Sequence, residues 1–579
     1  MAQADLVLLH PPSVYDFRES ASLYGPISDV VPSTAIFEMY PLGFMTIADY
    51  LNKHGFSVRI INIALKMLRS RRFSAEKLIG SLKPLAFGID LHWLVHAHGG
   101  LELAKIIKKI HPHTPVIFGG LSASYFHKEL ISYPEVDYVV RGDSTEEPLR
   151  LLLEVIKQKK EPVDVPNVTW ADKRGNTRVN ELSHVPTDLD AVSFDYRSMM
   201  RSSVKYYDII GHLPFNNWIK YPIVAILPWK GCVHNCVICG GSNFAYRHIC
   251  MREQPAYRDP VRIAEDIEIV SQSISGPVII LGDIRHAGMD YAKSLLDAIK
   301  SKNIKNHIAI ELFSPTSGEF IQMLADAIPN FNIEISPESH DEKVRRAFGR
   351  QYDNEGLERT IELALDAGCR RIDLFFMVGL PYQDIKSVDD TITYCEEKLL
   401  KNFCKYGEGR VRPFISPLAP FLDPGSLAFE EPEKYGYRLF HKTLEEHRQA
   451  LLAPSWKYML NYETRWMSRD EIVNSTYTAA LRLNRIKVQY RLLKEKEAQE
   501  IEGRTRKAME YITLIDKIML DENKDLQGEQ FREIREQINK LNNATICKKE
   551  ELNWPMRFIR FNILKVLQSI FIKETFHGK

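Results

Sequence analysis

The sequence is poor in cysteine and lacks long apolar runs. Its 579 residues include 8 cysteines, and the first of these is Cys232. Scattered cysteines of this kind exclude a disulfide framework and are typical of a protein in the reducing cytoplasm. The N-terminus lacks the basic segment of a secretory signal peptide, and no apolar run of about 18 residues predicts a transmembrane helix. We therefore expect a cytoplasmic protein.

An excess of charge of one sign is also missing. Lys and Arg total 76 and Asp and Glu total 75, which gives a formal net charge of +1. This balance offers no argument for nucleic acid as a partner. The dinucleotide pattern G-x-G-x-x-G is absent as well. A hydrophobic content of 45% is ordinary for a globular protein, and the length predicts three or four domains of about 150 residues each.

One short loop concentrates the chemically informative residues. Cys232, Cys236 and Cys239 follow the pattern C-x3-C-x2-C. Thiolates are the ligands that hold iron–sulfur clusters. Three thiolates can bind three irons of a cubane and leave the fourth iron open to chelate a small molecule. The alternative is a structural zinc site, which needs a fourth ligand such as His234 or Cys250.

The cysteine spacing resembles that of the radical S-adenosylmethionine (SAM) family, although Ile238 stands where an aromatic residue is usual. The resemblance implies that Cys232, Cys236 and Cys239 are the metal ligands and the catalytic centre of a [4Fe–4S] cluster. In that family the open iron binds SAM, and an electron from the cluster breaks a carbon–sulfur bond to give a 5′-deoxyadenosyl radical. The resemblance also implies a low-potential electron donor, a ferredoxin or a flavodoxin.

The first third of the chain alternates short apolar segments with helical ones. Strands are predicted at 5–9, 57–61, 85–89, 116–118 and 136–140, and helices at 40–54 and 96–111. This alternation predicts a doubly wound parallel sheet, in which ligands bind beyond the carboxyl ends of the strands. Those ends carry the candidate cofactor-binding residues Asp90, His92, Gly119, Gly120, Ser122 and Gly142.

The order of these segments resembles the cobalamin-binding domain of cobalamin-dependent radical SAM proteins. It is carried by His10-Pro11-Pro12, Tyr40–Gly43, Phe118–Gly120 and Val140–Asp143. The resemblance covers residues 1–180 and implies cobalamin as a cofactor. Asp90-Leu91-His92 matches part of D-x-H-x-x-G, a motif that supplies a histidine to cobalt, but Val95 replaces the glycine. His92 is therefore expected either as a lower cobalt ligand or as a histidine packed near the cofactor.

A connector and a second α/β domain follow. Residues 173–176 carry a hairpin signal, and 181–221 form an irregular, aromatic-rich linker. Between 222 and 430, strands are predicted at 222–227, 277–281, 308–313, 332–336, 371–378 and 411–416. Six βα units predict a partial (β/α)6 barrel of the radical SAM type, with its chemistry at the carboxyl ends of the strands.

Two of these strand ends resemble SAM-binding segments of the family. Leu281-Gly282-Asp283 stands where many members have Gly-Gly-Glu, which makes Asp283 the candidate for the SAM amino group. The alternative for Asp283 is a helix cap. Ser336 and Glu338 lie in the segment whose polar residues bind ribose hydroxyls, and they are the candidates for that role.

A third strand end and a group of arginines complete the set. Gly379 belongs to a Gly-Leu-Pro turn that the family places near adenine, with Gln383 in place of the usual glutamate. The arginines that follow the ribose-like segment are expected either to touch an anion or to form a solvated helix face. They are Arg345, Arg346 and Arg350.

Residues 431–579 are predicted to be mainly helical. The last stretch begins at Trp554-Pro555 and sets apolar residues among Arg557, Arg560, Lys565 and Lys573. A basic amphipathic helix is typical of a peripheral membrane contact. The alternative is a terminal helix that docks on the barrel or on a second subunit, and the sequence leaves both open.

Together these features predict a cobalamin-dependent radical SAM enzyme. The resemblance implies methylation, or related carbon–carbon bond formation, at a carbon whose hydrogen no general base can remove. The aromatic linker and the amphipathic C-terminus favour a lipid-like or isoprenoid substrate over another small molecule. The alternative is a non-catalytic scaffold that is stabilised by zinc or binds cobalamin.

Overall fold

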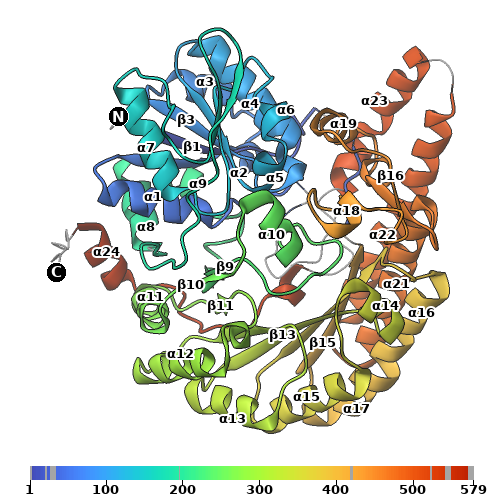
Figure 1. Ribbon diagram of the computed structural model, residues 1–579. Coiled ribbons are helices and arrows are strands. Elements are labelled where there is room, and N and C mark those ends of the chain that lie inside the picture. The colour runs from blue at the N-terminus through green and yellow to red at the C-terminus, as the bar shows by residue number, and fades with distance from the viewer. Residues whose placement is uncertain are drawn as a thin grey trace.

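The protein is described here by a computed structural model of residues 3–19, 22–26, 34, 36–194, 196–417, 421–521, 524–541 and 549–571. Two α/β domains face each other, the first formed by the N-terminal part of the chain and the second by its middle part (Figure 1). The helical C-terminal region runs along one side of both domains. The final segment then crosses back, so that both ends of the described chain lie on the same side.

The first domain is built on a twisted sheet. Its parallel strands are β1 (Leu6–His10), β2 (Val58–Asn62), β3 (Ala86–Asp90), β4 (Val116–Gly119) and β5 (Tyr138–Val140). These strands are almost wholly buried, as expected where helices cover both faces of a parallel sheet. The helices are α1 (Gly43–Lys53), α2 (Ile63–Arg69), α3 (Ala75–Gly80), α4 (Ala97–Ile110), α5 (Leu121–Tyr125), α6 (His127–Leu130) and α7 (Glu146–Lys157), with a short 3-10 helix at Leu94–His96.

The strand order of this sheet creates a ligand crevice. The strands run β2-β1-β3-β4-β5, so the order reverses between β1 and β3. In doubly wound sheets, ligands bind at such a switch point beyond the carboxyl ends. The predicted hairpin is confirmed, because β6 (Val168–Ala171) and β7 (Thr177–Val179) pair antiparallel and extend the sheet beyond β5.

The connector packs on the first domain through a buried ion cluster. It contains α8 (Tyr196–Lys205) and α9 (Ile209–His212). Asp208 caps α9 and lies 3.0 Å from Arg59 and 2.6 Å from Lys66. The connector is therefore held against β2 and α2, where both cations originate.

The second domain is an open barrel. Its parallel sheet runs β15-β14-β13-β12-β11-β8, with β8 and β15 as the edges. The strands are β8 (Val224–Ile226), β11 (Val278–Ile280), β12 (Ile308–Leu312), β13 (Phe331–Glu338), β14 (Ile372–Val378) and β15 (Val411–Pro417). A small hairpin of β9 (Trp229–Lys230) and β10 (Ala256–Tyr257) lies beside the cysteine loop. The predicted fold class is thus confirmed.

Helices cover the outer surface of the barrel. They are α11 (Pro260–Ser273), α12 (Met289–Ser301), α13 (Gly318–Ala327), α14 (Glu342–Phe348), α15 (Asn354–Asp366), α16 (Ile385–Tyr394) and α17 (Lys401–Phe403), with short helical turns at Ile284–Ala287, Cys395–Leu400 and Cys404–Tyr406. Most of them begin at an aspartate or serine whose side chain accepts a backbone N–H, for example Asp259 in α11. Helix α10 (Asn243–Cys250) instead packs against α5 of the first domain.

The C-terminal region flanks the barrel edge formed by β15. It comprises α18 (Leu427–Glu430), β16 (Tyr437–Leu439), α19 (Leu444–Ala450), α20 (Trp456–Met459), β17 (Tyr462–Thr464), α21 (Arg469–Gln489), α22 (Glu495–Met519), α23 (Lys524–Leu541), a 3-10 turn (Lys549–Leu552) and α24 (Ile563–Phe571). Helix α21 packs against β15 and α16. Helix α21 therefore buries one face on the barrel.

The terminal amphipathic segment differs from the predicted continuous helix. Trp554 is buried, and its indole Nε1 donates to Asp373 Oδ2 over 2.6 Å. Arg371 Nη1 donates to the Asn553 carbonyl over 2.7 Å. These anchors tie the chain to the start of β14, so the helix begins only at Ile563; residues 572–579 lie outside the described part. No helix within the described ranges is long and apolar enough to cross a bilayer.

One buried histidine joins the C-terminal region to the first domain. The ring of His447 is wholly buried against Phe126, Phe421 and Phe429. Its Nδ1 donates to the Thr443 carbonyl over 2.7 Å, and its Nε2 accepts from the Asn461 amide. Burial lowers the pKa of His447 from 6.5 to about 4, so the ring stays neutral in the folded protein.

We expect this histidine to make the protein sensitive to acid. Because the pKa is depressed on folding, its contribution is present above pH 6.5 and is lost as the pH falls through about 4. The free energy of unfolding should fall by up to about 3 kcal/mol over that window. Urea denaturation of wild type and His447→Gln at several pH values measures it. An equally steep decline in the variant would contradict the assignment.

Candidate active site

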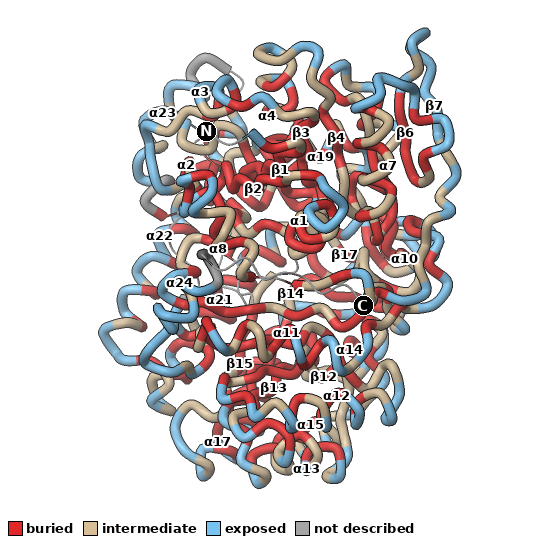
Figure 2. Tube along the Cα trace, turned by 90° about the vertical axis from the view of Figure 1, so that its left-hand side faces the viewer, coloured by how far each residue is buried: buried red, intermediate tan, exposed pale blue. Residues whose placement is uncertain are grey.

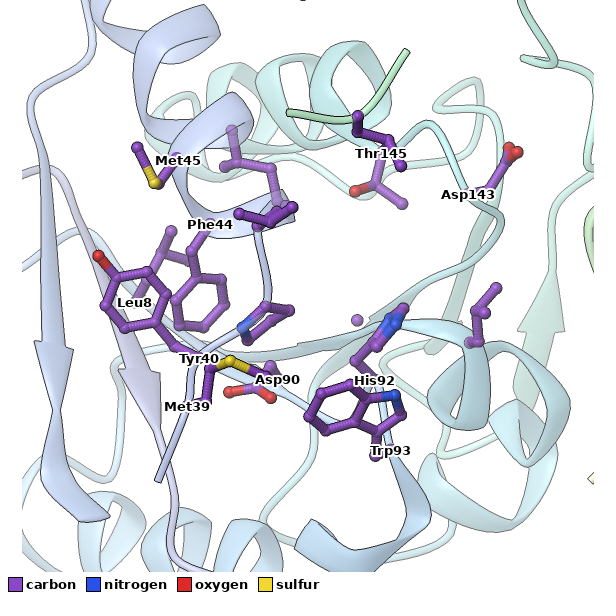
Figure 3. A pocket seen from close by; sticks show the side chains of 18 of the residues that line it. Leu8, Met39, Tyr40, Phe44, Met45, Asp90, His92, Trp93, Asp143 and Thr145 are labelled. Atoms are coloured by element: carbon purple, nitrogen blue, oxygen red, sulfur yellow. The ribbon is translucent and has the colours of Figure 1, made fainter. Parts of the chain in front are cut away.

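A cavity of about 510 Å3 lies where the carboxyl ends of the two sheets face each other. The first sheet contributes the ends of β1, β3, β4 and β5, and the barrel contributes the ends of β8, β11 and β12. The connector closes one side with Tyr196 and Phe215, beside Ile223, which directly precedes β8. Figure 3 shows Tyr40, Phe44 and His92 among the side chains around it. Its volume is within the range of small-molecule and cofactor sites.

The cradle at β3 and β4 depends on one glycine. Gly120 has φ +115°, and a Cβ added there would lie 2.5 Å from the Cα of His92. The Ser122 N–H and hydroxyl both donate to the His92 carbonyl, over 3.3 and 3.1 Å. Two loops that are distant in sequence are thus held in backbone contact beneath the cavity. Ser122 is buried and holds the loop, whereas the other five predicted residues of this domain line the cavity.

A buried polar network supports the cradle from below. Asp90 Oδ1 lies 2.9 Å from His10 Nδ1, and both His10 Nε2 and His96 Nε2 lie 3.0 Å from the carbonyl of Phe37. Desolvation lowers the pKa of His96 to about 4, which keeps it neutral. The sequence analysis did not assign a role to His10, although its place at the end of β1 was an available signal. His92 points toward the cavity beside Trp93 (Figure 3), and burial lowers its pKa as well.

The cysteine loop is shaped independently of any metal. Cys239 N donates to the Cys236 carbonyl over 3.1 Å, and Val237 N donates to Phe348 at the end of α14 over 2.9 Å. Two backbone N–H groups approach sulfur: His234 N lies 3.4 Å from Cys232 Sγ, and Gly241 N lies 3.3 Å from Cys239 Sγ. Such N–H···S contacts are a feature of iron–sulfur ligation.

The electrostatics of this loop favour binding of a positively charged group such as a metal ion. Burial raises the pKa of all three thiols, that of Cys236 to about 11. Their thiolates therefore need positive charge nearby, and the buried Arg350 acts on Cys232 and Cys236 in that sense. Iron would supply that charge, so the donor set fits a cluster held by three thiolates.

The residues considered as a fourth zinc ligand are engaged elsewhere. His234 Nε2 lies 2.8 Å from His286 Nε2, and Cys250 is buried on α10 with Ala245 and Ile249. Within the described part of the chain, no three His, Cys, Asp or Glu side chains converge to hold a single metal ion.

Asp283 lies at the end of β11, but both of its oxygens are occupied. They accept from the guanidinium of Arg285 and from the backbone N–H groups of Arg285 and Phe313. The sequence analysis missed a neighbour on the next strand, Glu311. Its carboxylate accepts from Gly282 N and lines the cavity. The pattern of β12 could have pointed to it, because Glu311 is the one charged residue in an otherwise apolar strand.

Glu338 is aimed by an irregularity in β13. The pairing of β13 with β14 shifts register between Ile335 and Glu338, and Glu338 takes φ +67°. Such bulges re-aim side chains next to active sites. Its Oε1 lies 3.6 Å from Arg350, its Oε2 has no hydrogen-bond partner among the described residues, and desolvation raises its pKa to about 7. The half-buried Ser336 lies within the same bulge.

The arginines after this strand are mostly not a solvated face. Arg345 and Arg350 are buried, and only Arg346 is exposed, where it pairs with Glu342 over 2.6 Å. Arg345 donates to the Ser339 carbonyl and supports the loop after β13. Buried and exposed positions alternate along α14, where the buried Arg345 is followed directly by the exposed Arg346. The sequence pattern alone therefore did not show which arginines are buried.

The Gly-Leu-Pro turn follows β14. Gly379 has φ +104°, and its N–H donates to Gln383 Oε1 over 2.8 Å. Gln383 Nε2 donates in turn to the Met377 carbonyl over 2.9 Å. The glutamine that replaces the usual glutamate therefore fixes the turn from within. Tyr437 of the C-terminal region donates to the Gly379 carbonyl and braces it from outside.

The fold and the site together define a class, in which a cobalamin-binding domain precedes a radical SAM domain. The chain carries both domains of that class. It matches the B12 binding domain over residues 29–152 and the Radical SAM superfamily over residues 226–395. The predicted family and its cofactor set of cobalamin, a [4Fe–4S] cluster and SAM are thereby confirmed. The prediction of a radical SAM enzyme agrees with the match to the Radical SAM superfamily.

Two characterised relatives share part of the sequence. One is the hopanoid C-3 methylase of Methylococcus capsulatus, 23% identical over 291 residues, or 49% of this chain and 50% of that protein. The chain thus matches about half the length of this relative. The other is the cytidylyl-2-hydroxyethylphosphonate methyltransferase of Streptomyces wedmorensis, 21% identical over 472 residues, or 71% of this chain and 84% of that protein.

Solved structures show the same fold. OxsB with aqua-cobalamin and S-adenosylmethionine bound superimposes with a TM-score of 0.56 at 11% identity, covering 98% of this chain and 79% of that one. The methyltransferase TsrM of Kitasatospora setae, with tryptophan and a SAM analogue bound, gives 0.53 at 16% identity over 76% and 79%.

Proposed function

We propose that the protein is a cobalamin-dependent radical SAM methyltransferase that modifies an unactivated carbon of a lipid-like substrate. One observation carries this proposal. A single cavity is bounded by the glycine cradle of the first domain and by the barrel, and it reaches Lys230, which lies two residues before the first cysteine. A group bound in the cradle and a group bound in the barrel would therefore share one chamber.

The chain's residues divide into three sets. Cys232, Cys236 and Cys239 would hold the cluster. The residues for cobalamin are Asp90, His92, Gly119, Gly120, Ser122 and Gly142, with Ser122 acting through the backbone of His92. The residues for SAM are Asp283, Ser336, Glu338 and Gly379, to which we add Glu311. When bound, these groups supply an adenosyl radical that removes hydrogen and a methyl group that replaces it.

The walls of the cavity favour an apolar substrate. The barrel and the connector contribute apolar groups, including Leu281, Phe215 and Ile223. Lys230 also lines the cavity, but its Nζ lies 3.1 Å from Glu146 Oε1, so its charge is balanced within the protein. An apolar carbon skeleton would leave water for such a space without giving up any hydrogen bond.

Methyl transfer is preferred to other carbon–carbon bond formation because both characterised relatives are named for methylation. We further propose that a ferredoxin or flavodoxin reduces the cluster. The described cysteines are all free thiols, which is consistent with a reducing cytoplasmic location.

The test is anaerobic reconstitution. The protein is loaded with iron, sulfide and hydroxocobalamin, reduced, and given SAM labelled in its methyl group together with a cellular lipid extract. We expect 5′-deoxyadenosine, S-adenosylhomocysteine and label in the lipid fraction. Label confined to water-soluble products would reject the lipid substrate. Stoichiometric zinc without SAM cleavage would favour the scaffold alternative.

A further inference from the structure

Exposed apolar side chains gather on two segments, and none of these exposed side chains lines the cavity. In the connector, Tyr207 is 91% exposed, and in the C-terminal segment Phe558 is 98% exposed. Further large apolar residues are exposed in the same segments: Val204, Ile209, Ile210, Ile219, Ile559, Ile563, Leu564 and Leu567. Apolar groups concentrated in this way on a surface mark an interaction site more often than scattered ones do.

These two segments form one surface. Helix α24 packs against α8, and α8 packs against α9. The ring of Phe561 lies 5.9 Å from that of Trp218, and Phe561 also forms a β-bridge with Ile274. Both views place α24 beside α8 (Figures 1 and 2). We call the exposed apolar residues named above, together with the cations around them, the connector–α24 face.

The side chains of this face are held outward by the backbone. Ile563, Leu564 and Leu567 are spaced so that they share one side of α24, and all three are exposed. Tyr207 takes φ +52°, a conformation that side chains rarely adopt. The chain therefore holds a strained tyrosine toward solvent rather than folding it into the core.

Positive charge predominates around these residues. Exposed cations are Lys205, Lys220, Arg557, Arg560 and Lys565. Residues 554–571 contain no aspartate or glutamate. The one acid of residues 196–221 is Asp208, which is buried and paired with Arg59 and Lys66. Helix α11, which also contacts α24, carries the exposed Glu265 and the half-buried Glu268. The two segments themselves thus combine apolar groups with an excess of positive charge.

We propose that the connector–α24 face docks on an anionic lipid bilayer. Aliphatic and aromatic groups can enter the acyl boundary while Lys and Arg remain with anionic headgroups. A second copy of the chain fits less well, because a two-fold contact would bring these cations against the same cations.

This surface is continuous with the wall of the candidate active site. The connector that displays Val204 and Tyr207 also supplies Tyr196 and Phe215 to the cavity. A bilayer docked on this face would therefore contact the connector, which also forms part of the cavity wall. This inference rests on the proposed function, because docking would bring a lipid substrate to the wall of the cavity.

The test is flotation of the full-length, cofactor-loaded protein with vesicles of phosphatidylcholine, with and without phosphatidylglycerol. We expect binding to the anionic vesicles. Leu564→Ser should weaken binding to anionic vesicles about tenfold, because the variant lacks a leucine side chain that would move from water into the bilayer. Arg557→Glu should weaken it at least about fivefold. Matched controls are Leu520→Ser at the end of α22, where the leucine is 82% exposed, and Lys83→Glu after α3; both should bind like wild type.

Equal binding of all four variants would overturn the proposal, as would equal binding to neutral vesicles. Dimerisation that Leu564→Ser abolishes, without vesicle binding, would assign the face to a second copy instead. SAM cleavage is measured on the same samples in the absence of vesicles. Cleavage without flotation would reject the docking alone, whereas flotation without cleavage would reject the proposed function and keep the docking.

Discussion

Cys239→Ala is expected to abolish the reductive cleavage of SAM while the protein remains folded. The turn around Cys239 is held by its backbone, since its N–H donates to Cys236 and its carbonyl accepts from Ser242, each over 3.1 Å. Alanine keeps both bonds and removes only the thiol. With two thiolates left, one more iron of a cubane loses its protein ligand. We expect 5′-deoxyadenosine formation to fall by at least about a thousandfold.

Iron content, visible absorption and 5′-deoxyadenosine are measured on the same anaerobic preparation. The matched control is Cys404→Ala, because Cys404 is exposed and lies outside the loop. It should retain full activity and iron. Substantial SAM cleavage by Cys239→Ala would contradict the role of this cysteine, and a comparable loss in Cys404→Ala would show that the assay reports general damage.

Gly120→Ala is expected to remove cobalamin binding and to destabilise the first domain. The added methyl would lie 2.5 Å from the Cα and N of His92, in a backbone with φ +115°. Neither atom belongs to a flexible side chain, so β3 and β4 would have to separate at the cradle. We expect a loss of about 3 kcal/mol or more in the free energy of unfolding.

Two other glycines serve as controls for this change. Gly288 has φ +98° but nothing within 4 Å of an added Cβ, so Gly288→Ala tests backbone strain alone and should cost only about 1 kcal/mol. Gly119→Ala meets only the Val140 carbonyl at 3.7 Å, so the fold should persist while a methyl enters the cavity wall. Cobalamin retained after desalting and the urea midpoint are the measurements. Cobalamin retention by Gly120→Ala equal to wild type would contradict the cradle.

Local sequence patterns were sufficient to predict most of the architecture. The predicted strands at 85–89 and 371–378 match β3 (Ala86–Asp90) and β14 (Ile372–Val378) within a residue. Apolar runs bounded by turn residues specify such strands, since a buried parallel strand needs apolar groups on both faces. The same reasoning failed for the C-terminal segment, where helical periodicity from Trp554 gave way to anchoring by Arg371 and Asp373, roughly 180 residues earlier.

The candidate site was found only in part for a similar reason. A cysteine spacing or a Gly-Gly pair is visible in a line of letters, because the residues that cooperate are neighbours. Glu311 and the pairing of His10 with Asp90 were not visible, because each acts through a partner from another strand or loop. Arg350 was one of three candidate arginines, but its approach to Glu338 was not visible. Asp283 was visible, but not its engagement by Arg285.

The amino-acid sequence by itself determined the two α/β domains, the thiol loop and the strand ends on which ligands were expected, since these follow from hydrophobic period, turn chemistry and short spacings. Only the tertiary structure decided that the two sets of strand ends share one cavity, which arginines are buried, and that the connector and α24 form a common surface. Contacts between distant segments depend on how whole elements pack, and no short stretch of sequence encodes that arrangement.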